Sequence, residues 1–186
     1  DFTIGFDTAV NTALDAISKL RDTTSSHERV SIIEVMGRNC GDIALYAGLA
    51  GGAEAILVPE MPYDLDEICK KLISSNNRGK TQSIILVAEG VGSATEIGHV
   101  IQQRTGLEAR STILGHIQRG GTPSATDRLL GSRLAGAAVQ LLIDGKSSRV
   151  VGIKDNDIID LDIHEALSMK RQFNLDMYNL AQILSI

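Results

Sequence analysis

Residues 32–52 read IIEVMGRNCGDIALYAGLAGG, and this stretch predicts the fold. The β-branched run Val30–Val35 is typical of a buried strand. At Met36-Gly37-Arg38 the run ends, glycine permits a close approach of the backbone, and arginine supplies a planar, permanent cation. Cys40–Leu49 then has apolar residues at helical spacing and is followed by the glycine pair Gly51-Gly52. A strand, a turn and a helix in this order indicate half of a parallel α/β unit, whose turns commonly bind anions and small substrates.

The composition is that of a globular protein and excludes two classes of partner. The 186 residues are 43% hydrophobic and 22% charged, which suits one domain or slightly more. A formal net charge of −5 argues against a general affinity for nucleic acid or an anionic membrane, and no apolar run approaches the length of a membrane span. Cys40 and Cys69 lack metal or disulfide spacing, so we expect reduced core thiols in a cytoplasmic protein.

Strand and helix patterns alternate along the whole chain. Helices are expected at 3–22, 40–49, 64–78, 95–105, 125–143, 162–169 and 174–184, and strands at 30–35, 55–58, 83–88, 108–114 and 149–153. Ile158-Ile159 is an extension or a partner of the last strand. Thr122 as N-cap and Pro123 as first helical residue should start the helix that includes 125–143. The alternation predicts an α/β fold with a largely parallel sheet.

Polar groups that could carry chemistry follow three predicted strands. These groups are Met36-Gly37-Arg38, Glu89-Gly90 and the glycine-rich loop Gly115–Gly121, which contains His116 and Arg119. Because the carboxyl ends of parallel strands lie at one edge of a sheet, the three loops could converge. Arginines, a histidine and helix N-termini would neutralise a phosphate, and Glu89 could accept hydrogen bonds from sugar hydroxyls. Together they suggest a phosphosugar, although a structural role explains each residue taken alone.

A second group of charged and small residues lies at predicted helix ends and turns. It contains Arg21, Gly52-Ala53-Glu54, Arg78 and Lys80. Composition alone does not distinguish a binding site here from a solvated surface that complements the helix dipoles.

Long blocks of the sequence resemble the bacterial 6-phosphofructokinase family. They read IEVMGRNCGDIALYAGLAGGAEAILVPE from residue 33, VAEGVG from residue 87 and STILGHIQRGGTPSATDRLLGSRLAG from residue 111. The resemblance covers essentially the whole chain and corresponds to the C-terminal part of the family's subunit. It implies a three-layer α/β/α fold and a glycolytic enzyme that transfers the γ-phosphoryl group of ATP to fructose 6-phosphate with Mg²⁺, as a homotetramer.

The resemblance also implies roles for residues at two of the strand ends. Met36 and Gly37 would lie near the sugar, and Arg38 would contact the transferring phosphoryl group as the catalytic residue of this chain. Glu89 would accept hydrogen bonds from the sugar hydroxyls.

Four further residues match the family's contacts to the sugar phosphate. His116 and Arg119 match residues that bind the 6-phosphate and the sugar. Arg29 and Arg110 match arginines that reach the 6-phosphate in the site of a neighbouring subunit, which makes the site a property of the assembly.

The second group resembles the family's effector site for ADP or phosphoenolpyruvate. The matching positions are Arg21, Gly52, Ala53, Glu54, Arg78, Lys80, Thr81 and Gln82. Glu54 would lie near the Mg²⁺ of the effector nucleotide. The family often reads Lys-Lys-His after the glycine at position 79, whereas this sequence reads Lys80-Thr81-Gln82, so a cation and an imidazole are lost from the phosphate contacts.

The family's glycine-rich nucleotide loops and its Thr-Ile-Asp-Asn-Asp motif, which holds the general base, do not occur in this sequence. We therefore expect a segment of a longer protein that is inactive alone. By the family's layout, 1–117 forms the substrate and effector domain, 118–168 belongs to the ATP-binding domain, and 169–186 returns to the substrate domain. The helix in 118–168 should expose an apolar face formed by Leu129, Leu130, Leu134 and Val139.

Three other interpretations remain at this stage. The chain could be a non-catalytic regulatory domain that binds a phosphosugar or a nucleotide. It could belong to a pyrophosphate-dependent relative, because the residues that select the phosphoryl donor lie outside this sequence. A structural domain with accidental glycines is the third.

Overall fold

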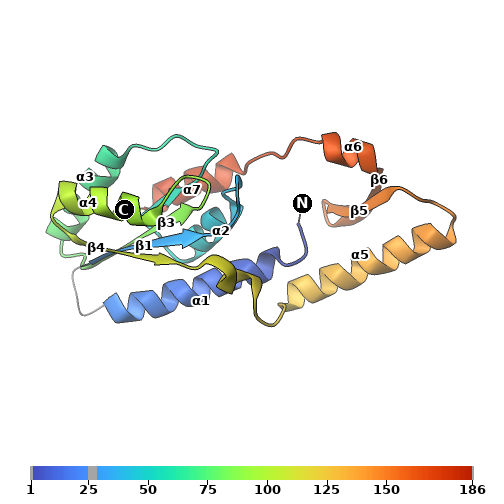
Figure 1. Cartoon of the computed structure of the whole chain (residues 1–186), viewed down its shortest axis with the longest axis horizontal. Coiled ribbons are helices and arrows are strands. Elements are labelled where there is room, and N and C mark those ends of the chain that lie inside the picture. Colours follow the sequence, from blue (N-terminus) through green and yellow to red (C-terminus); the bar gives the residue numbers. More distant parts are fainter. Residues whose placement is uncertain (1, 25–28, 186) are drawn as a thin grey trace. The chain divides into compact units, whose positions relative to one another are not determined.

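The structure of the chain is a computed structural model that describes residues 2–24 and 29–185 (Figure 1). It contains two compact units. Unit 1 combines the described residues up to Thr8 with Thr122–Gln172, and unit 2 combines Ala9–Gly121 with the described residues from Phe173 onward. Helix α1 (Phe6–Thr24) therefore begins in unit 1 and continues in unit 2.

The core of unit 2 is a four-stranded parallel sheet. Strands β1 (Arg29–Val35), β2 (Ala55–Leu57), β3 (Gln82–Ala88) and β4 (Glu108–Ile113) are arranged in the order β2-β3-β1-β4. The inner strands β1 and β3 are buried almost throughout, as expected for parallel strands covered on both faces. The predicted α/β fold with a parallel sheet is confirmed.

Helices cover both faces of this sheet. On one face, α3 (Leu65–Asn77) and α4 (Ala94–Thr105) form a buried cluster with the strands, which includes Val30, Ile32, Leu72 and Ile101. On the other face, α2 (Asp42–Ala50) packs so closely that a Cβ at Gly48 would lie 2.7 Å from the side chain of Ile56. Helix α7 (Leu175–Leu184) contacts α2 and β2. The result is a three-layer α/β/α arrangement.

Unit 1 is built from α5 (Ala125–Ile143), β5 (Arg149–Lys154), β6 (Asp157–Asp162) and α6 (Ile163–Ser168). Strands β5 and β6 pair antiparallel, with Ile158 opposite Ile153. The two residues between them, Asp155 and Asn156, both have positive φ, as two-residue hairpin turns require. Ile158-Ile159 is therefore a partner of β5, in a hairpin separate from the parallel sheet.

The start of α5 differs from the prediction. The helix begins at Ala125, and Ser124 is the N-cap, because its Oγ accepts a hydrogen bond from the Asp127 N–H. The predicted start, with Thr122 as N-cap and Pro123 as first helical residue, is wrong.

The buried carboxylate of Asp127 caps a second helix. It accepts hydrogen bonds from the Gly5 N–H (2.9 Å), the Thr8 N–H (2.8 Å) and the Thr8 hydroxyl, which lie at the N-terminus of α1. Asp127 is only 4% exposed, so the starts of α1 and α5 are joined within unit 1. A negative charge at this position also complements the helix dipole.

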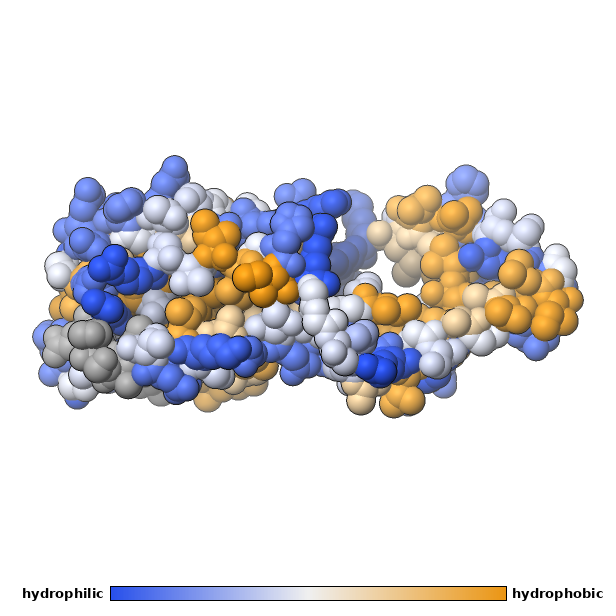
Figure 2. All heavy atoms as spheres, turned by 60° about the horizontal axis from the view of Figure 1, so that its bottom comes forward, coloured by the Kyte–Doolittle hydropathy of each residue, from blue (hydrophilic) through white to orange (hydrophobic). Residues whose placement is uncertain are grey.

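Large hydrophobic residues are exposed on unit 1 (Figure 2). On α5, Leu129 is 67% exposed and Val139 55%, whereas Leu130 is only 6% exposed and Leu134 lies between these extremes. The predicted apolar face therefore includes Leu129 and Val139 but not Leu130, which is buried. Further exposed residues on this unit are Leu142, Ile143, Leu167 and Met169.

None of the helices in the described part of the chain combines the length and the apolar character needed to cross a membrane.

Replacing Asp127 by alanine should lower the free energy of unfolding by about 1–3 kcal/mol, because partly buried N–H donors lose a charged acceptor. Burial raises the pKa of Asp127, but the hydrogen bonds from Thr8 and Gly5 outweigh it and bring the pKa below its usual value. The carboxylate therefore contributes its full stabilisation above the unfolded-state pKa and loses it as the pH falls through the folded-state pKa. Denaturant titrations of the chain and of Asp127→Ala, from neutral pH to about pH 3, measure both effects.

The exposed acid Asp176, in the first turn of α7, provides the control. Asp176→Ala should cost less than about 1 kcal/mol. Equal losses for the two variants would contradict the capping role of Asp127.

Candidate functional site

Three strand ends meet at the turn that follows β1. The Met36 N–H donates to Gln118 Oε1 (2.8 Å), and the N–H groups of Gly37 and Arg38 both donate to Glu89 Oε1 (3.1 and 2.6 Å). Glu89 follows β3, and Gln118 follows β4. The predicted convergence of the three loops is therefore observed, and side chains from two of them fix three consecutive backbone N–H groups of the third.

The backbone of this turn depends on glycine at two positions. Gly37 has a φ of 153°, and a Cβ there would lie 2.2 Å from the carbonyl oxygen of Cys40. A Cβ at Gly90 would lie 2.1 Å from the carbonyl oxygen of Arg38. Arg38 itself has a φ of 53°, in the left-handed region, and its side chain is exposed. The turn therefore directs a guanidinium group to the surface at the edge of the sheet.

Protein carboxylates occupy the N-termini of the two helices beside the turn. Glu60 accepts the Gly41 N–H at the start of α2 (3.0 and 3.1 Å), and Glu34 accepts the Ala94 N–H at the start of α4 (3.0 Å). A protein carboxylate thus already accepts one N–H at the start of each helix and offsets part of the positive end of its dipole. The contribution of these N-termini to a phosphate site stays a prediction.

The segment after β4 is a short helix rather than the predicted loop. Gly115–Arg119 forms a 3₁₀-helix, η1. His116 and Arg119 are both exposed and, being three residues apart, lie on the same side of η1. Gln118 is only 3% exposed and bonds to the turn instead. The sequence analysis did not identify Gln118, because a polar residue in a glycine-rich segment gives no periodic signal of burial.

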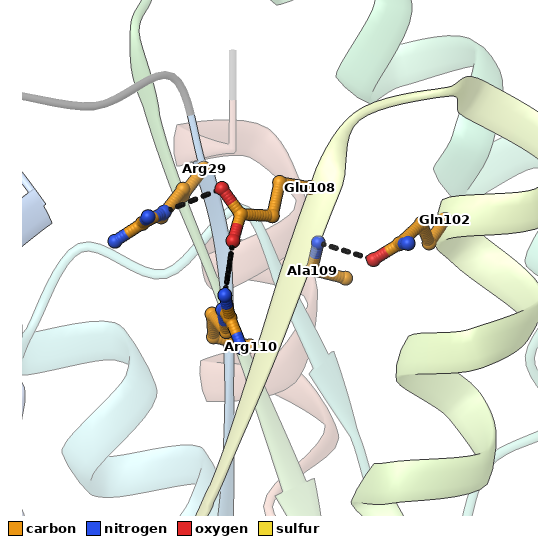
Figure 3. Close-up of polar contacts among 5 residues, drawn as sticks. All are labelled: Arg29, Gln102, Glu108, Ala109 and Arg110. Carbon is orange, nitrogen blue, oxygen red and sulfur yellow. Dashed lines mark hydrogen bonds and ion pairs between the residues drawn. The ribbon is translucent and has the colours of Figure 1, made fainter.

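Arg29 and Arg110 lie elsewhere and share a carboxylate (Figure 3). Arg29 Nε donates to Glu108 Oε2 (2.7 Å), and Arg110 Nε donates to Glu108 Oε1 (2.8 Å). Arg29 is the first residue of β1, whereas Arg38 lies in the turn beyond Val35, the last residue of that strand. The length of the strand therefore separates the two arginines by about 20 Å. The structure does not bring Arg29 and Arg110 to the turn within this chain.

The two arginines lower the pKa of Glu108, and one of them, Arg110, borders a cavity. The hydrogen bond from Arg29, followed by that from Arg110, lowers the pKa of Glu108 below its usual value. Arg110 and Glu108 line a cavity of about 420 Å³ together with residues of α4, among them His99 and Gln102. Gln102 also accepts the Ala109 N–H of β4 (3.1 Å; Figure 3).

Most of the second predicted group lines a separate cavity of about 400 Å³ in unit 2. The lining residues from that group are Arg21, Gly52, Glu54, Lys80, Thr81 and Gln82. Arg78 and Ala53 are not among the lining residues: Arg78 bonds to the Ser75 hydroxyl (3.4 Å), and Ala53 is buried.

Charges in this second cavity are held by local contacts. Arg21 donates to the carbonyl oxygens of Gly51 and Gly52 at the end of α2. Lys80 Nζ lies 2.7 Å from Glu54 Oε1, and Glu54 Oε2 accepts the Ile84 N–H. The cavity therefore presents two cations beside one carboxylate that already has partners.

The described residues offer poor ligands for a resident metal ion. No group of three His, Cys, Asp or Glu side chains lies close enough together in 2–24 and 29–185 to hold one. Among the described residues, Glu54 is the only acid that lines the second cavity, so it fits Mg²⁺ only where a bound nucleotide supplies phosphate oxygens.

A family model described as phosphofructokinase matches residues 1–142. The chain belongs to the phosphofructokinase family. Among curated relatives, it is 62% identical over 186 residues to the ATP-dependent 6-phosphofructokinase of Clostridium botulinum (strain Alaska E43 / Type E3), covering 100% of this chain and 58% of the relative. The protein of the same name from strain Loch Maree / Type A3 is 61% identical, again with 58% of its length covered.

Solved structures of the family agree with the fold. A phosphofructokinase from Saccharomyces cerevisiae superimposes with a TM-score of 0.85 and 32% identity, over 99% of this chain and 25% of that chain. A pyrophosphate-dependent phosphofructokinase from Marinobacter aquaeolei shares the fold (TM-score 0.75, 23% identity, 94% of this chain and 49% of that chain). The chain spans little more than half the length of its curated relatives.

Loss of either arginine should raise the pKa of Glu108 toward its usual value, because a partner that favours the ionised carboxylate is removed. Arg29→Gln should have the larger effect, since its hydrogen bond is the leading cause of the shift. NMR titration of the side-chain carboxyl carbon measures the pKa. Arg104→Gln, whose own partner is Asp66, is the matched control and should leave it unchanged. The same pKa in all three variants would show that the arginines do not act on Glu108.

Proposed function

We propose that this chain is the sugar-phosphate-binding part of an ATP-dependent 6-phosphofructokinase, a glycolytic enzyme of the cytoplasm. The observation that carries the proposal is the meeting of the Met36–Arg38 turn with Glu89 and η1, in a chain of the phosphofructokinase family. The reaction would transfer the γ-phosphoryl group of ATP to the 1-hydroxyl of fructose 6-phosphate and yield fructose 1,6-bisphosphate.

The residues at the turn suit the sugar end of this reaction. Phosphoryl transfer depends on positioned positive charge more than on covalent chemistry by the protein. Arg38 is exposed on a constrained turn, so its guanidinium group can stabilise charge on the transferring phosphoryl group. Glu89 uses Oε1 for the backbone of the turn, which leaves Oε2 to accept a sugar hydroxyl, while Met36 and Gly37 border the sugar.

The 6-phosphate requires cations from more than one part of the assembly. His116 and Arg119 project from the same side of η1 and supply cationic contacts within this chain. Arg29 and Arg110 lie too far along the sheet to reach the same phosphate, so we assign them to the site of a neighbouring subunit in a homotetramer. Arginine suits this role because it binds phosphate oxygens in pairs.

Several parts of the reaction would come from outside these residues. We assign the general base and most contacts to ATP and its Mg²⁺ to the rest of a longer subunit, so the chain alone should be inactive. Residues 118–168 would complete the ATP-binding domain, and the exposed Leu129 and Val139 would supply the apolar surface for it. Residues 1–117 and 169–186 would form the domain for substrate and effector.

A regulatory site is the second candidate function, and the cavity lined by Arg21 and Lys80 favours it. Two cations beside a glycine backbone suit the phosphate groups of ADP or phosphoenolpyruvate. Glu54 would release Lys80 and approach the Mg²⁺ of a bound nucleotide.

Calorimetric titration of Lys80→Ala with ADP should show weaker binding than the unaltered protein, and equal binding would exclude Lys80 from the site.

The choice of ATP as phosphoryl donor rests on relatives. Proteins that match the whole chain at 61–62% identity are named ATP-dependent, whereas the pyrophosphate-dependent structure is only 23% identical. A pyrophosphate-dependent enzyme and a non-catalytic regulatory domain are therefore the alternatives that activity measurements must exclude.

In a full-length subunit, Arg119→Ala should raise the KM for fructose 6-phosphate about tenfold or more and leave the KM for ATP unchanged. The reason is the loss of a charge-assisted hydrogen bond to phosphate, worth about 1.5–3 kcal/mol. Steady-state kinetics with each substrate varied in turn measure the effect. Arg104→Ala removes an exposed arginine on α4 that pairs with Asp66, and it should change neither constant. Equal rises of both KM values in Arg119→Ala would contradict a role at the sugar phosphate.

A further inference from the structure

The side chain of Gln118 has an unusual environment. It is 3% exposed, within a segment whose neighbours His116, Ile117 and Arg119 are exposed. Its Oε1 accepts the Met36 N–H (2.8 Å). That acceptor role fixes the orientation of the amide, because the opposite orientation would place two N–H donors against each other.

The other end of the same amide has no partner. Among the described residues, Gln118 Nε2 is a buried side-chain nitrogen that makes no hydrogen bond. A buried donor without an acceptor lowers stability, and native proteins contain few of them. A methionine would fill similar space without that cost. Packing alone therefore does not explain a glutamine here.

We propose that Gln118 is a positioning residue for the Met36–Arg38 turn, whose Oε1 fixes the distance between that turn and the cationic segment η1. The proposal rests on the proposed function, because it makes the spacing of Arg38 from His116 and Arg119 depend on one hydrogen bond. Glu89 holds the N–H groups of Gly37 and Arg38, whereas Gln118 belongs to η1 itself. Gln118 is thus the direct hydrogen-bonded connection between the two groups of cations.

The connection matters because the reacting phosphoryl group and the 6-phosphate sit at opposite ends of one sugar. Misplacement of catalytic groups by about 1 Å can reduce a rate by about a hundredfold. Gln118 touches neither phosphate in this scheme and acts through the backbone of Met36. Its replacement should therefore change sugar-phosphate kinetics more than it changes the stability of the fold.

The test compares Gln118→Met with Gln103→Met, the same change at an exposed glutamine of α4, in full-length subunits. In Gln118→Met we expect faster hydrogen exchange at the Met36 amide and kcat/KM for fructose 6-phosphate reduced about tenfold. The thermal midpoint should change little, because removal of the unpaired Nε2 donor offsets loss of the acceptor for the Met36 N–H. The KM for ATP should stay the same. Gln103→Met should match the unaltered protein in every measurement. Gln118→Asn, which is one methylene shorter, should reproduce the faster exchange if the methionine variant does not fold.

Two results would overturn the proposal. Unchanged exchange at Met36 would show that the hydrogen bond does not hold the turn. Faster exchange with unchanged sugar-phosphate kinetics would show that the bond exists but does not position the site. Failure of the proposed function is distinguishable, because the unaltered full-length protein would then lack phosphofructokinase activity while the exchange comparison still decides the role of Gln118.

Discussion

The structure of the candidate site depends on how three consecutive N–H groups are satisfied where β1 ends. Beyond Val35 the chain leaves the sheet, and the N–H groups of Met36, Gly37 and Arg38 lose their strand partners. Gln118 and Glu89 accept all three, and each comes from the end of a different parallel strand. Backbone donors at such a turn need acceptors, so the requirement that forms the turn also draws the neighbouring loops together. Glycine at 37 and at 90 makes room for this approach.

In the same region, the acidic side chains have structural partners, whereas the basic side chains remain accessible to a ligand. Acidic side chains are committed to backbone N–H groups: Glu60 at the start of α2, Glu34 at the start of α4, and one oxygen of Glu89 at the turn. The basic residues Arg38 and Arg119 remain exposed at the surface. A chain with a net charge of −5 can thus present locally positive groups to a phosphate. At the other end of β1 the arrangement differs, because the Glu108 carboxylate accepts hydrogen bonds from the guanidinium groups of both Arg29 and Arg110.

The parallel α/β sheet and the meeting of strand ends followed from the sequence because they rest on periodicity and on the geometry of parallel sheets. The three layers were implied by the family resemblance. The identity of the capping and buried side chains could not be predicted from the sequence, because several neighbouring groups could make the same hydrogen bond. Ser124 caps α5 although Thr122-Pro123 has the stronger local signal, and Glu60 reaches α2 from a loop after β2. Burial of Gln118 depends on the path of a distant turn, and no local pattern encodes it. Of the predicted effector residues, Arg78 and Ala53 do not line the cavity: Arg78 bonds to Ser75, and Ala53 is buried.

We expect the site to recognise a sugar through its phosphate. Calorimetric titration of the full-length protein with fructose 6-phosphate and with fructose measures this preference. Two charge-assisted arginine contacts of about 1.5 kcal/mol each predict that the phosphate improves binding by about a hundredfold or more. Arg29→Ala combined with Arg110→Ala should reduce that preference, while the contacts of His116 and Arg119 retain part of it. Equal affinity for the two sugars in the unaltered protein would contradict the account.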